Sequence, residues 1–479
     1  MDQLQLATSL FDTLEAKDVA YIHWKSNEHL HAAVRGQTDL DLLVPPEHRD
    51  DFRSIVDSLG FVTMLSPEVR RVPGLESFLG FDESTGSLLH LDVHYRLVLG
   101  EQLIKNHHLP IEGWLLADPG RLEGVRIPPP GRELLLLYVR AMLKMTGRQL
   151  LRSIVKGGSP LPERIQTEAT WLADQVGESE LTEAAETVQL GITSAEVAEF
   201  HRRAQGRNFD WRYVLGRKRS LRKRLRRHER LPRHRAVPKA MWLRFRSTRL
   251  AKRLGWGIPP RRLQGPAPLV AAVGADGAGK SRLTKDLERW LGWKLTVRHV
   301  YFGQPKTGVL FKLLNKPGSM ARAQKKASGP LAGIARLTDS LKWVILANQR
   351  RRLATDARKR AQSGEVVIAE RYPLPEFRSM TAPMDGPRLQ DASGTMARRE
   401  LRAYDTIETP DLVLVLQTDL GTLRDRKLDL TIEEHTAKVE AVRHLTPGPG
   451  RAIIDAGPPY ERVLLEAKTA IWKAIRESR

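Results

Sequence analysis

The sequence predicts an α/β protein made of two folded domains with a basic segment between them. Residues 263–479 alternate short, continuous apolar runs with helical patterns, which is typical of a parallel sheet between helices. Residues 1–200 begin with mixed strand-like and helical patterns and end in helical ones, which indicates an α+β domain followed by helices. Residues 201–262 hold almost all of the net charge, and we expect a basic helical connector there.

The elements expected in residues 1–200 follow from the spacing of apolar residues. A helical pattern opens the chain at 4–14, and a second helix is expected near 52–59. Strand-like runs lie at 19–24 (VAYIHW), 39–44 (DLDLLV) and 88–95 (LLHLDVHY). Three prolines at 128–130 interrupt the chain before ELLLLYVRAMLKM at 133–145, which predicts a buried helix, and further helices run to about 205.

The second domain is predicted from apolar runs that are too short for helices. These runs are LVAAV (269–273), VRHVYF (297–302), EVVIAE (365–370), DLVLVL (411–416) and AIID (452–455). Helices are expected after the first run, from about 330 to 364, from a capping box at 431–434 to about 445, and near the end of the chain as far as 475. Strands bounded by helices in this way predict a parallel sheet.

Composition excludes several classes of protein. The 479 residues contain no cysteine, so a disulfide scaffold, a thiolate metal site and a thiol nucleophile are excluded. No window reaches the ~18 apolar residues of a membrane span, and the first residues lack the apolar core of a secretory signal. We therefore expect a soluble, cytoplasmic protein.

Residues 274–281, GADGAGKS, fit the phosphate-binding pattern G-x-x-x-x-G-K-[ST] between a strand and a helix. Two glycines allow close backbone approach, and the loop N–H groups with the start of the helix can cradle phosphates. Lys280 is expected to reach the β/γ-phosphates, and Ser281 to ligate Mg²⁺. The sequence thus predicts a site for ATP and Mg²⁺, formed by Gly274, Asp276, Gly277, Ala278, Gly279, Lys280 and Ser281.

About 215 residues of this second domain resemble the thymidylate kinases, a family of nucleoside-monophosphate kinases. The resemblance rests on D-G-A-G-K-S at 276–281, E-R-Y at 370–372, P-D-L at 410–412, and the bases Arg424, Arg426 and Lys427. It implies that Asp276 contacts the acceptor's sugar, that Glu370 lies near Mg²⁺, and that Arg371, with Tyr372, binds the acceptor phosphate. It also implies a lid whose Arg424 or Arg426 stabilises transition-state charge, and a homodimer.

Physical arguments support part of this assignment, and two departures limit it. Phosphoryl transfer needs in-line positioning and positive charge, and an acid at the end of a parallel strand beside the loop is well placed to hold Mg²⁺ through water. The acid here is Glu370 instead of the family's aspartate, and residues 373–389 replace the stretch in which the family reads thymine. The phosphoryl chemistry therefore carries over better than the nucleobase preference.

Three carboxylates of the first domain suit a metal site. Asp39 and Asp41 alternate along one strand and so share a face, and Asp92 lies in a second apolar strand. Carboxylates on adjacent strands can hold two Mg²⁺ ions that clamp the attacking and leaving oxygens. His90 and His94 flank Asp92, and we expect both to be structural.

The same region, about 20–110, resembles the polymerase-β-like nucleotidyltransferase superfamily. The resemblance rests on W-K-S-N at 24–27 and G-Q-T-D-L-D-L-L-V at 36–44. It implies that Lys25 and Ser26 form the turn that grips a triphosphate, and that Asp39, Asp41 and Asp92 hold the metal ions. Lys-Ser replaces the usual Gly-Ser, so a domain that keeps the fold and binds without transferring is the alternative.

The charge of the chain is concentrated in one segment. Residues 201–262 contain 23 bases and two acids, which gives +21 of the formal net charge of +22. A stripe of leucines with nearby tryptophans follows the most basic run. The pattern suits an anionic membrane surface, which would place the protein at the inner face of the membrane, or nucleic-acid phosphates. The third interpretation is a solvated linker whose apolar stripe packs on a domain.

These observations predict an enzyme that transfers a phosphoryl group from ATP to a small phosphorylated acceptor, with a nucleotidyltransferase-like domain fused to it. Such a pair suggests supply of nucleotides or nucleotide sugars, as for a surface polysaccharide. The first alternative is a kinase and nucleotidyltransferase that processes nucleic-acid ends, for which binding would fall steeply with salt. The second is a scaffold that binds ATP without turnover.

Overall fold

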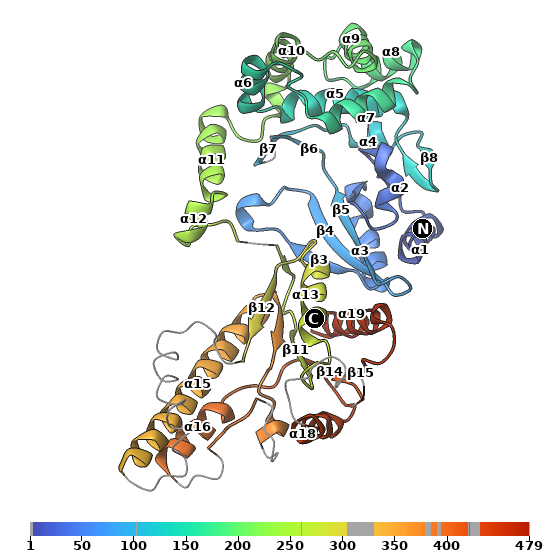
Figure 1. The fold of residues 1–479 in the computed structure, drawn as a ribbon. Helices are drawn as coiled ribbons and strands as arrows, with labels where there is room; N and C mark the ends of the chain where they lie inside the picture. The colour runs from blue at the N-terminus through green and yellow to red at the C-terminus, as the bar shows by residue number, and fades with distance from the viewer. Residues whose placement is uncertain are drawn as a thin grey trace. The chain divides into compact units, whose positions relative to one another are not determined.

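The computed structural model describes residues 3–101, 103–259, 261–303, 330–378, 385–389, 394–419, 421 and 432–478 (Figure 1). Its chain forms two compact units, Met1–Arg261 and Arg262–Arg479. Each unit has its own hydrophobic core. Among the described residues, no helix combines the length and the apolar composition needed to cross a bilayer.

The first unit contains a mixed sheet in the order β1-β2-β5-β4-β3. Strand β2 runs parallel to β5, and the other neighbours are antiparallel. Leu89, Leu91 and Val93 of β5 lie in one core with residues of helices α1 and α3. Because side chains alternate along a strand, the residues between them point to the opposite face, which carries His90, Asp92 and His94.

The sheet-bearing part of this unit contains short connecting helices and two small hairpins. Its elements are α1 (Gln5–Ala16), β1 (Ile22–His23), η1 (Asn27–His29), α2 (Leu30–Ala33), β2 (Leu40–Leu43), η2 (Pro46–His48), α3 (Arg49–Ser58), β3 (Val62–Leu65), η3 (Glu68–Arg70), β4 (Leu75–Asp82), β5 (Ser87–His94), β6 (Val98–Glu101), β7 (Ile104–His108), α4 (Glu112–Leu116), β8 (Gly120–Leu122) and β9 (Val125–Ile127).

The helical part of the unit is built around α5, whose residues from Leu134 to Val139 are fully buried. Its helices are α5 (Pro130–Lys144), α6 (Gly147–Lys156), α7 (Glu163–Ala173), α8 (Glu178–Thr187), α9 (Ser194–Gln205), α10 (Trp211–Arg224), η4 (Leu225–His228), α11 (Arg233–Arg246) and α12 (Arg249–Arg253). Val214 and Leu221 of α10 lie in the same core as α5. Residues 201–261 therefore fold with residues 1–200, whereas the sequence suggested a separate connector.

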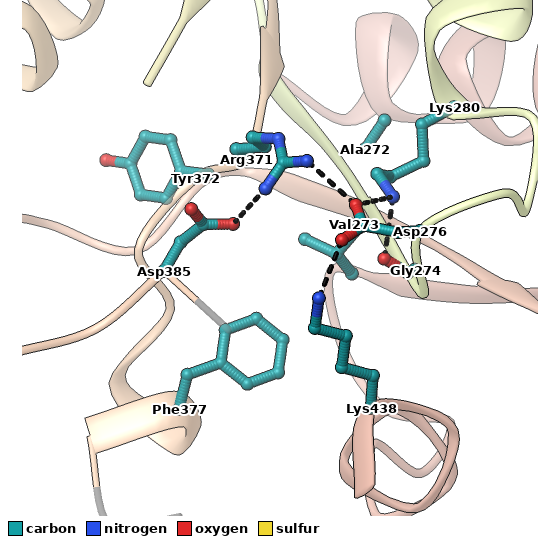
Figure 2. A pocket seen from close by; sticks show the side chains of 10 residues that line it. All are labelled: Ala272, Val273, Gly274, Asp276, Lys280, Arg371, Tyr372, Phe377, Asp385 and Lys438. Atoms are coloured by element: carbon teal, nitrogen blue, oxygen red, sulfur yellow. Dashed lines mark hydrogen bonds and ion pairs between the residues drawn. The ribbon is translucent and has the colours of Figure 1, made fainter. Parts of the chain in front are cut away.

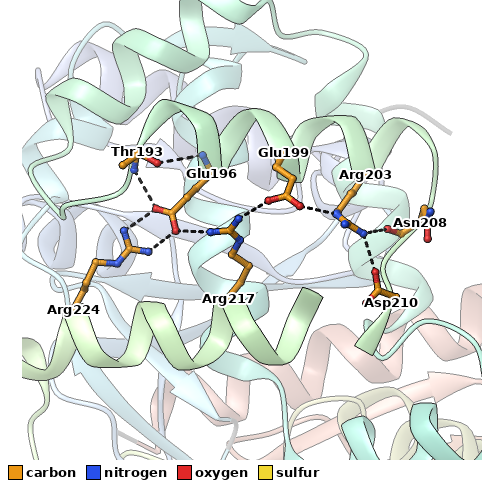
Figure 3. A network of polar contacts seen from close by, with 8 residues as sticks. All are labelled: Thr193, Glu196, Glu199, Arg203, Asn208, Asp210, Arg217 and Arg224. Atoms are coloured by element: carbon orange, nitrogen blue, oxygen red, sulfur yellow. Dashed lines mark hydrogen bonds and ion pairs between the residues drawn. The ribbon is translucent and has the colours of Figure 1, made fainter. Parts of the chain in front are cut away.

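A network of ion pairs joins α9 to α10 (Figure 3). Glu196 accepts hydrogen bonds from both Arg224 and Arg217, and Arg217 also pairs with Glu199 at 2.5 Å. Arg203 continues the chain from Glu199 to Asp210. Several of the bases that dominate the composition of 201–262 are thus neutralised by acids of the helical part.

The second unit is a parallel sheet in the order β12-β13-β11-β14-β15, as the continuous apolar runs predicted. Its elements are β10 (Arg262–Leu263), β11 (Leu269–Gly274), α13 (Lys280–Leu291), β12 (Val297–Tyr301), α15 (Pro330–Gln362), β13 (Val366–Glu370), η5 (Pro375–Arg378), α16 (Thr395–Asp405), β14 (Leu412–Gln417), α18 (Ile432–Arg443), β15 (Arg451–Asp455) and α19 (Tyr460–Glu477).

Helices cover both faces of this sheet (Figure 1). Leu269, Ala271 and Val273 of the central strand β11 lie in one core with residues of α15 and with Val442 of α18. Val270 and Ala272 alternate with them and face the side on which α13 and α19 contact the strands. The loop between β11 and α13 lies at the carboxyl edge of the sheet, where ligands of such folds bind.

Several predicted elements differ in extent. The run at 19–24 forms only the two residues of β1, because Val19 bonds back to Leu14 and the short strand pairs with β2 alone. Strands β3 and β4 were not predicted, since LESFLGFD mixes polar residues and glycine with a buried apolar set. The capping residue Thr431 lies outside the described residues, and α18 ends two residues before the expected Leu445.

Candidate functional site

The loop at 274–281 has the shape that its glycines predict. A Cβ on Gly274 would lie 2.8 Å from the carbonyl oxygen of Leu416 on the neighbouring strand. Gly277 and Gly279 have φ values of +98° and +88°, a region that side chains disfavour. Gly279 immediately precedes α13, so the loop brings main-chain N–H groups and the positive end of the helix dipole to one place.

Lys280 lies folded against its own loop. Its ammonium group donates to the carbonyl oxygens of Gly274 and Ala275, both at 2.8 Å, and lies 4.0 Å from the carboxylate of Asp276. Burial lowers the pKa of Lys280 to about 8, although the charge of Asp276 opposes this shift. At neutral pH the group is therefore mostly a buried cation, directed at the centre of the loop.

Glu370 ends strand β13 and lies beside the loop. Its carboxylate accepts hydrogen bonds from Ser281 at 2.9 Å and Thr284 at 2.5 Å, and it lies 3.1 Å from the Nε2 atom of His299. Burial alone would raise the pKa of Glu370, but the bonds from His299, Thr284 and Ser281 outweigh it and lower the pKa to about 2. A hydroxyl and an ionised carboxylate are thus adjacent, and this donor set fits Mg²⁺.

Arg371, Asp276 and Lys438 form a charged cluster on the other side of the loop (Figure 2). Asp276 binds Arg371 through one carboxylate oxygen and Lys438 through the other, each at 2.7 Å. Burial opposes ionisation of Asp276, but Lys438, Arg371 and Lys280 hold its pKa well below the usual range. Arg371 adopts a left-handed backbone conformation, with φ +57°, at the end of β13.

A pocket opens between this cluster and the segment after η5 (Figure 2). Asp385 lines it and lies 3.8 Å from Arg371, while the buried Arg350 of α15 binds both the carbonyl and the carboxylate of Asp385. Burial raises the pKa of Asp385, against the influence of these arginines. The rings of Tyr372 and Phe377 complete the lining, and the Tyr372 hydroxyl donates to the carbonyl of Glu408.

The structure therefore places most of the residues predicted for the second domain around one pocket or its adjoining loop. Arg424, Arg426 and Lys427 lie outside the described residues. Sequence reasoning did not find Lys438, Asp385, Arg350, His299 and Thr284. Lys438 is 162 residues from Asp276, and no local pattern marks it. Asp385 lies in the stretch 373–389, where the sequence departs from the kinase family. That departure was the sequence signal that could have drawn attention to Asp385.

Asp41 and Asp92 lie on the neighbouring parallel strands β2 and β5, whereas Asp39, expected on the same strand as Asp41, immediately precedes β2. Asp41 of β2 is directly opposite Asp92 of β5. Asp39 and Asp92, with His90, form a cluster whose possible ligand atoms all lie within 4.8 Å of one another. His90 is buried and its Nδ1 lies 3.0 Å from Asp39. Asp92 also accepts a hydrogen bond from Ser77 at 2.5 Å. Among the described residues, the cluster thus contains His90 with two of the expected acids, and the third, Asp41, is not part of it.

The turn at Lys25 and Ser26 is engaged by side chains of the same unit. The ammonium group of Lys25 pairs with Asp41 at 2.6 Å. The N–H group of Ser26, which has φ +59°, donates to the carboxylate of Glu168 at 3.0 Å. The pair of Lys25 with Asp41 thus links the turn to the strand that follows Asp39. The N–H group of Ser26, which the nucleotidyltransferase resemblance assigns to a triphosphate, is instead bonded to Glu168 of α7.

A parallel sheet with a glycine loop, lysine and serine between its central strand and a helix defines the second unit as an α/β fold of the P-loop type. No protein-family model matches the chain. It is 27% identical over 217 residues to the uncharacterized ATP-binding protein YghR of Escherichia coli (strain K12), covering 42% of this chain and 86% of YghR. It is equally identical, over 234 residues, to the uncharacterized ATP-binding protein YghS of that strain, covering 44% and 94%.

A solved structure of thymidylate kinase from Candida albicans aligns with 45% of this chain and with 93% of the thymidylate kinase chain. The sequence identity is 18% and the TM-score is 0.30. That TM-score is too low for the superposition to support an inference about this chain. The assignment of the fold therefore rests on the strand order, the loop and the helices described above.

Proposed function

We propose that the second unit binds ATP with Mg²⁺ and transfers the γ-phosphoryl group to a small phosphorylated acceptor, a nucleoside monophosphate or a related metabolite. The observation that carries the proposal is the contact of Ser281 with Glu370 beside the glycine loop and Lys280. This places a hydroxyl, an ionised carboxylate and a cation together at the carboxyl edge of a parallel sheet. The names of YghR and YghS, which describe them as ATP-binding proteins, support this proposal.

Each residue of the site has a role in this proposal. The loop amides and Lys280 bind the β- and γ-phosphates, and Ser281 and Glu370 would hold Mg²⁺, which neutralises phosphate charge when bound. Thr284 and His299 orient the carboxylate of Glu370. In the reaction the bond from the γ-phosphorus to the bridging oxygen breaks, an acceptor oxygen forms the new bond, and ADP leaves. Arg424 and Arg426 stay assigned to the lid by resemblance alone.

The charged cluster of Figure 2 supports a phosphorylated acceptor. Arg371 and Lys438 direct two cations to the edge of the pocket, and Asp276 holds both in place. An acceptor phosphate can bind these cations, with the sugar against Asp276 or Asp385. The rings of Tyr372 and Phe377 offer an apolar wall to the remainder of the acceptor.

The experiment incubates the full-length protein with ATP, Mg²⁺ and a panel of nucleoside and sugar phosphates, and uses mass spectrometry to detect a gain of phosphate mass. Lys280→Ala is expected to lower the rate by at least about 100-fold, because the buried cation stabilises the transferring group. Lys285→Ala, an exposed lysine on the same helix, is the matched control.

Two other outcomes would decide against the proposal. ATP binding without turnover across the panel would favour the scaffold that binds ATP. Phosphorylation of nucleic-acid ends, with affinity that falls steeply between low and physiological salt, would favour the end-processing enzyme.

We also propose that the first unit transfers a nucleotidyl group, which would connect the two units in supplying nucleotides or nucleotide sugars. The juxtaposition of Asp41 with Asp92, next to Asp39, favours this reaction. Asp41→Asn is expected to remove Mg²⁺-dependent nucleotidyl transfer, detected as a gain of nucleotidyl mass, and to leave phosphoryl transfer unchanged. Asp50→Asn, on the exposed side of α3, is the control. Equal transfer by the variant and the parent would show that the site is misplaced.

A further inference from the structure

Helices α11 and α12, with the turn after them, present apolar side chains to solvent. Met241 is 67% exposed and Leu250 is 59% exposed, although both are large apolar residues. We call the surface formed by residues 233–256 the basic–apolar face. Its exposed apolar members are Val237, Met241, Trp242, Leu250, Leu254 and Trp256. A concentration of exposed apolar side chains in so short a segment marks an interaction site.

The same face is strongly cationic. Residues 233–256 contain eight bases and no acid. In the part of the chain that the structure describes, no carboxylate forms an ion pair with any of them. This distinguishes them from Arg203, Arg217 and Arg224, whose charges are neutralised in the α9–α10 network (Figure 3). Bases without an ion pair and exposed apolar side chains therefore occur together at α11 and α12.

The face is held in place by contacts behind it. Leu243 of α11 and Ala251 of α12 are buried, and Asn106 of β7 bonds to the main chain of Leu231 in both directions. Arg246 donates to the carbonyl oxygens of Trp256 and Gly257, which fixes the turn after α12. The ring of Phe245 stacks on Trp242 at 5.7 Å and meets Trp256 edge-on at 6.3 Å. The exposed side chains thus belong to a folded surface.

We propose that the basic–apolar face binds the surface of an anionic lipid bilayer. Lys and Arg attract anionic headgroups, while tryptophan and aliphatic side chains enter the boundary between headgroups and acyl chains. The aliphatic residues favour this partner over nucleic acid, since Val237, Leu250 and Leu254 have no ring to stack on a base and no polar group to bond its edge. The inference stands on this surface alone and does not depend on the proposed phosphoryl transfer.

The test is co-sedimentation of the full-length protein with vesicles of phosphatidylcholine alone or mixed with phosphatidylglycerol. Binding is expected to the mixed vesicles only, with a blue shift of tryptophan fluorescence, and to weaken as salt screens the charges. Lys252→Glu/Arg253→Glu is expected to weaken binding at least about 25-fold, since each lost charge accounts for about fivefold. Lys473→Glu, exposed on α19, is the charge control and should bind like the parent.

A second variant tests the apolar contribution. Leu250→Ser/Leu254→Ser changes two exposed residues and is expected to weaken vesicle binding about tenfold or more, and to remove salt-resistant binding. Leu401→Ser, an exposed leucine of the second unit, is the control. The proposal is overturned if both double variants bind mixed vesicles as the parent does. It is also overturned if the parent binds no vesicle but binds duplex DNA or RNA with steep salt dependence.

Discussion

The side chain of Glu133 is buried in the helical part of the first unit. It is fully buried in α5, and its carboxyl oxygens accept hydrogen bonds from the side chain of Asn27 at 2.7 Å and from the N–H group of Asn27. Burial raises the pKa of Glu133 to about 8, and the bonds from Asn27 only partly oppose the shift. The folded protein therefore keeps this proton at pH values where the unfolded chain has lost it.

The pKa of Glu133 predicts a pH dependence of stability. Between about pH 4.5 and 8 the folded state binds more protons than the unfolded state, so the free energy of unfolding falls as the pH rises. Glu133→Gln removes this titration. Relative to the parent, the variant is expected to gain stability on the order of 2–4 kcal/mol from pH 5 to pH 8.

Chemical denaturation at several pH values, following the transition of the first unit, measures this difference. Glu163→Gln, on the exposed surface of α7, should track the parent at every pH. A constant difference between Glu133→Gln and the parent over this range would contradict the raised pKa.

Site residues that belong to one continuous motif could be predicted from the sequence. Site residues that come together from distant segments of the chain could not. The loop from Gly274 to Ser281 follows from a continuous motif, because all its parts come from one turn of chain. The contact of His90 with Asp39, which precedes β2, depends on the pairing of β2 with β5, and no local pattern shows it. The ion pair between Lys438 and Asp276 could not be predicted either, because it requires α18 to pack beside the loop.

At the scale of elements, α9 and α10 are joined by charge as well as by apolar packing. Arg224 binds both carboxylate oxygens of Glu196, at 2.6 and 2.7 Å, and most of the Glu196 side chain is shielded from solvent. Two parallel bonds to a shielded carboxylate are stronger and less sensitive to salt than a single exposed pair.

A double-mutant cycle measures this coupling. Glu196→Gln and Arg224→Gln, alone and together, are expected to give a coupling energy of about 1–2 kcal/mol in urea unfolding. The pair Lys473–Glu477 on α19, at 3.8 Å and exposed, should give less than about 0.5 kcal/mol in the same assay. If both cycles give equal values that vanish in high salt, the network contributes no more than a surface pair.

Elements with strong periodic patterns were predicted well, and short or mixed ones were not. The central strands β11, β13 and β14 of the parallel sheet are continuous, mostly apolar runs because helices cover both faces, and the partly exposed edge strands β12 and β15 were predicted as well. The hairpins β6–β7 and β8–β9 are three to five residues long per strand and carry polar residues. The pairing of such short strands depends on the side chains packed around them and on the turns that connect them. The periodicity of the sequence shows neither.

At the scale of the whole molecule, the two units have separate cores and are expected to unfold separately. Met1–Arg261 contains the cores around α5 and around the mixed sheet, and Arg262–Arg479 contains its own around the parallel sheet. The two units divide between Arg261 and Arg262. The sequence did not reveal that α10 packs into the first unit, because arginine-rich helices are usually solvated.

Calorimetry of the full-length protein should therefore show two transitions. An unhydrolysable ATP analogue with Mg²⁺ is expected to raise only the transition of the second unit, by about 2.7 kcal/mol of stability at 100 times the Kd. Lys280→Ala should abolish this shift while leaving the other transition unchanged. A single transition that moves as a whole with the analogue would show that the units unfold together.

The contact between Ser26 and Glu168 has a consequence for folding during translation. These residues are 142 positions apart in the chain, and the neighbouring contact of Asn27 with Glu133 spans 106. During translation the turn at Ser26 emerges on the order of 10 s before its partner helix, at ordinary rates of synthesis. Until α7 has been synthesised, the N–H group of Ser26 can bond only to water or to another group, so this contact forms late in synthesis.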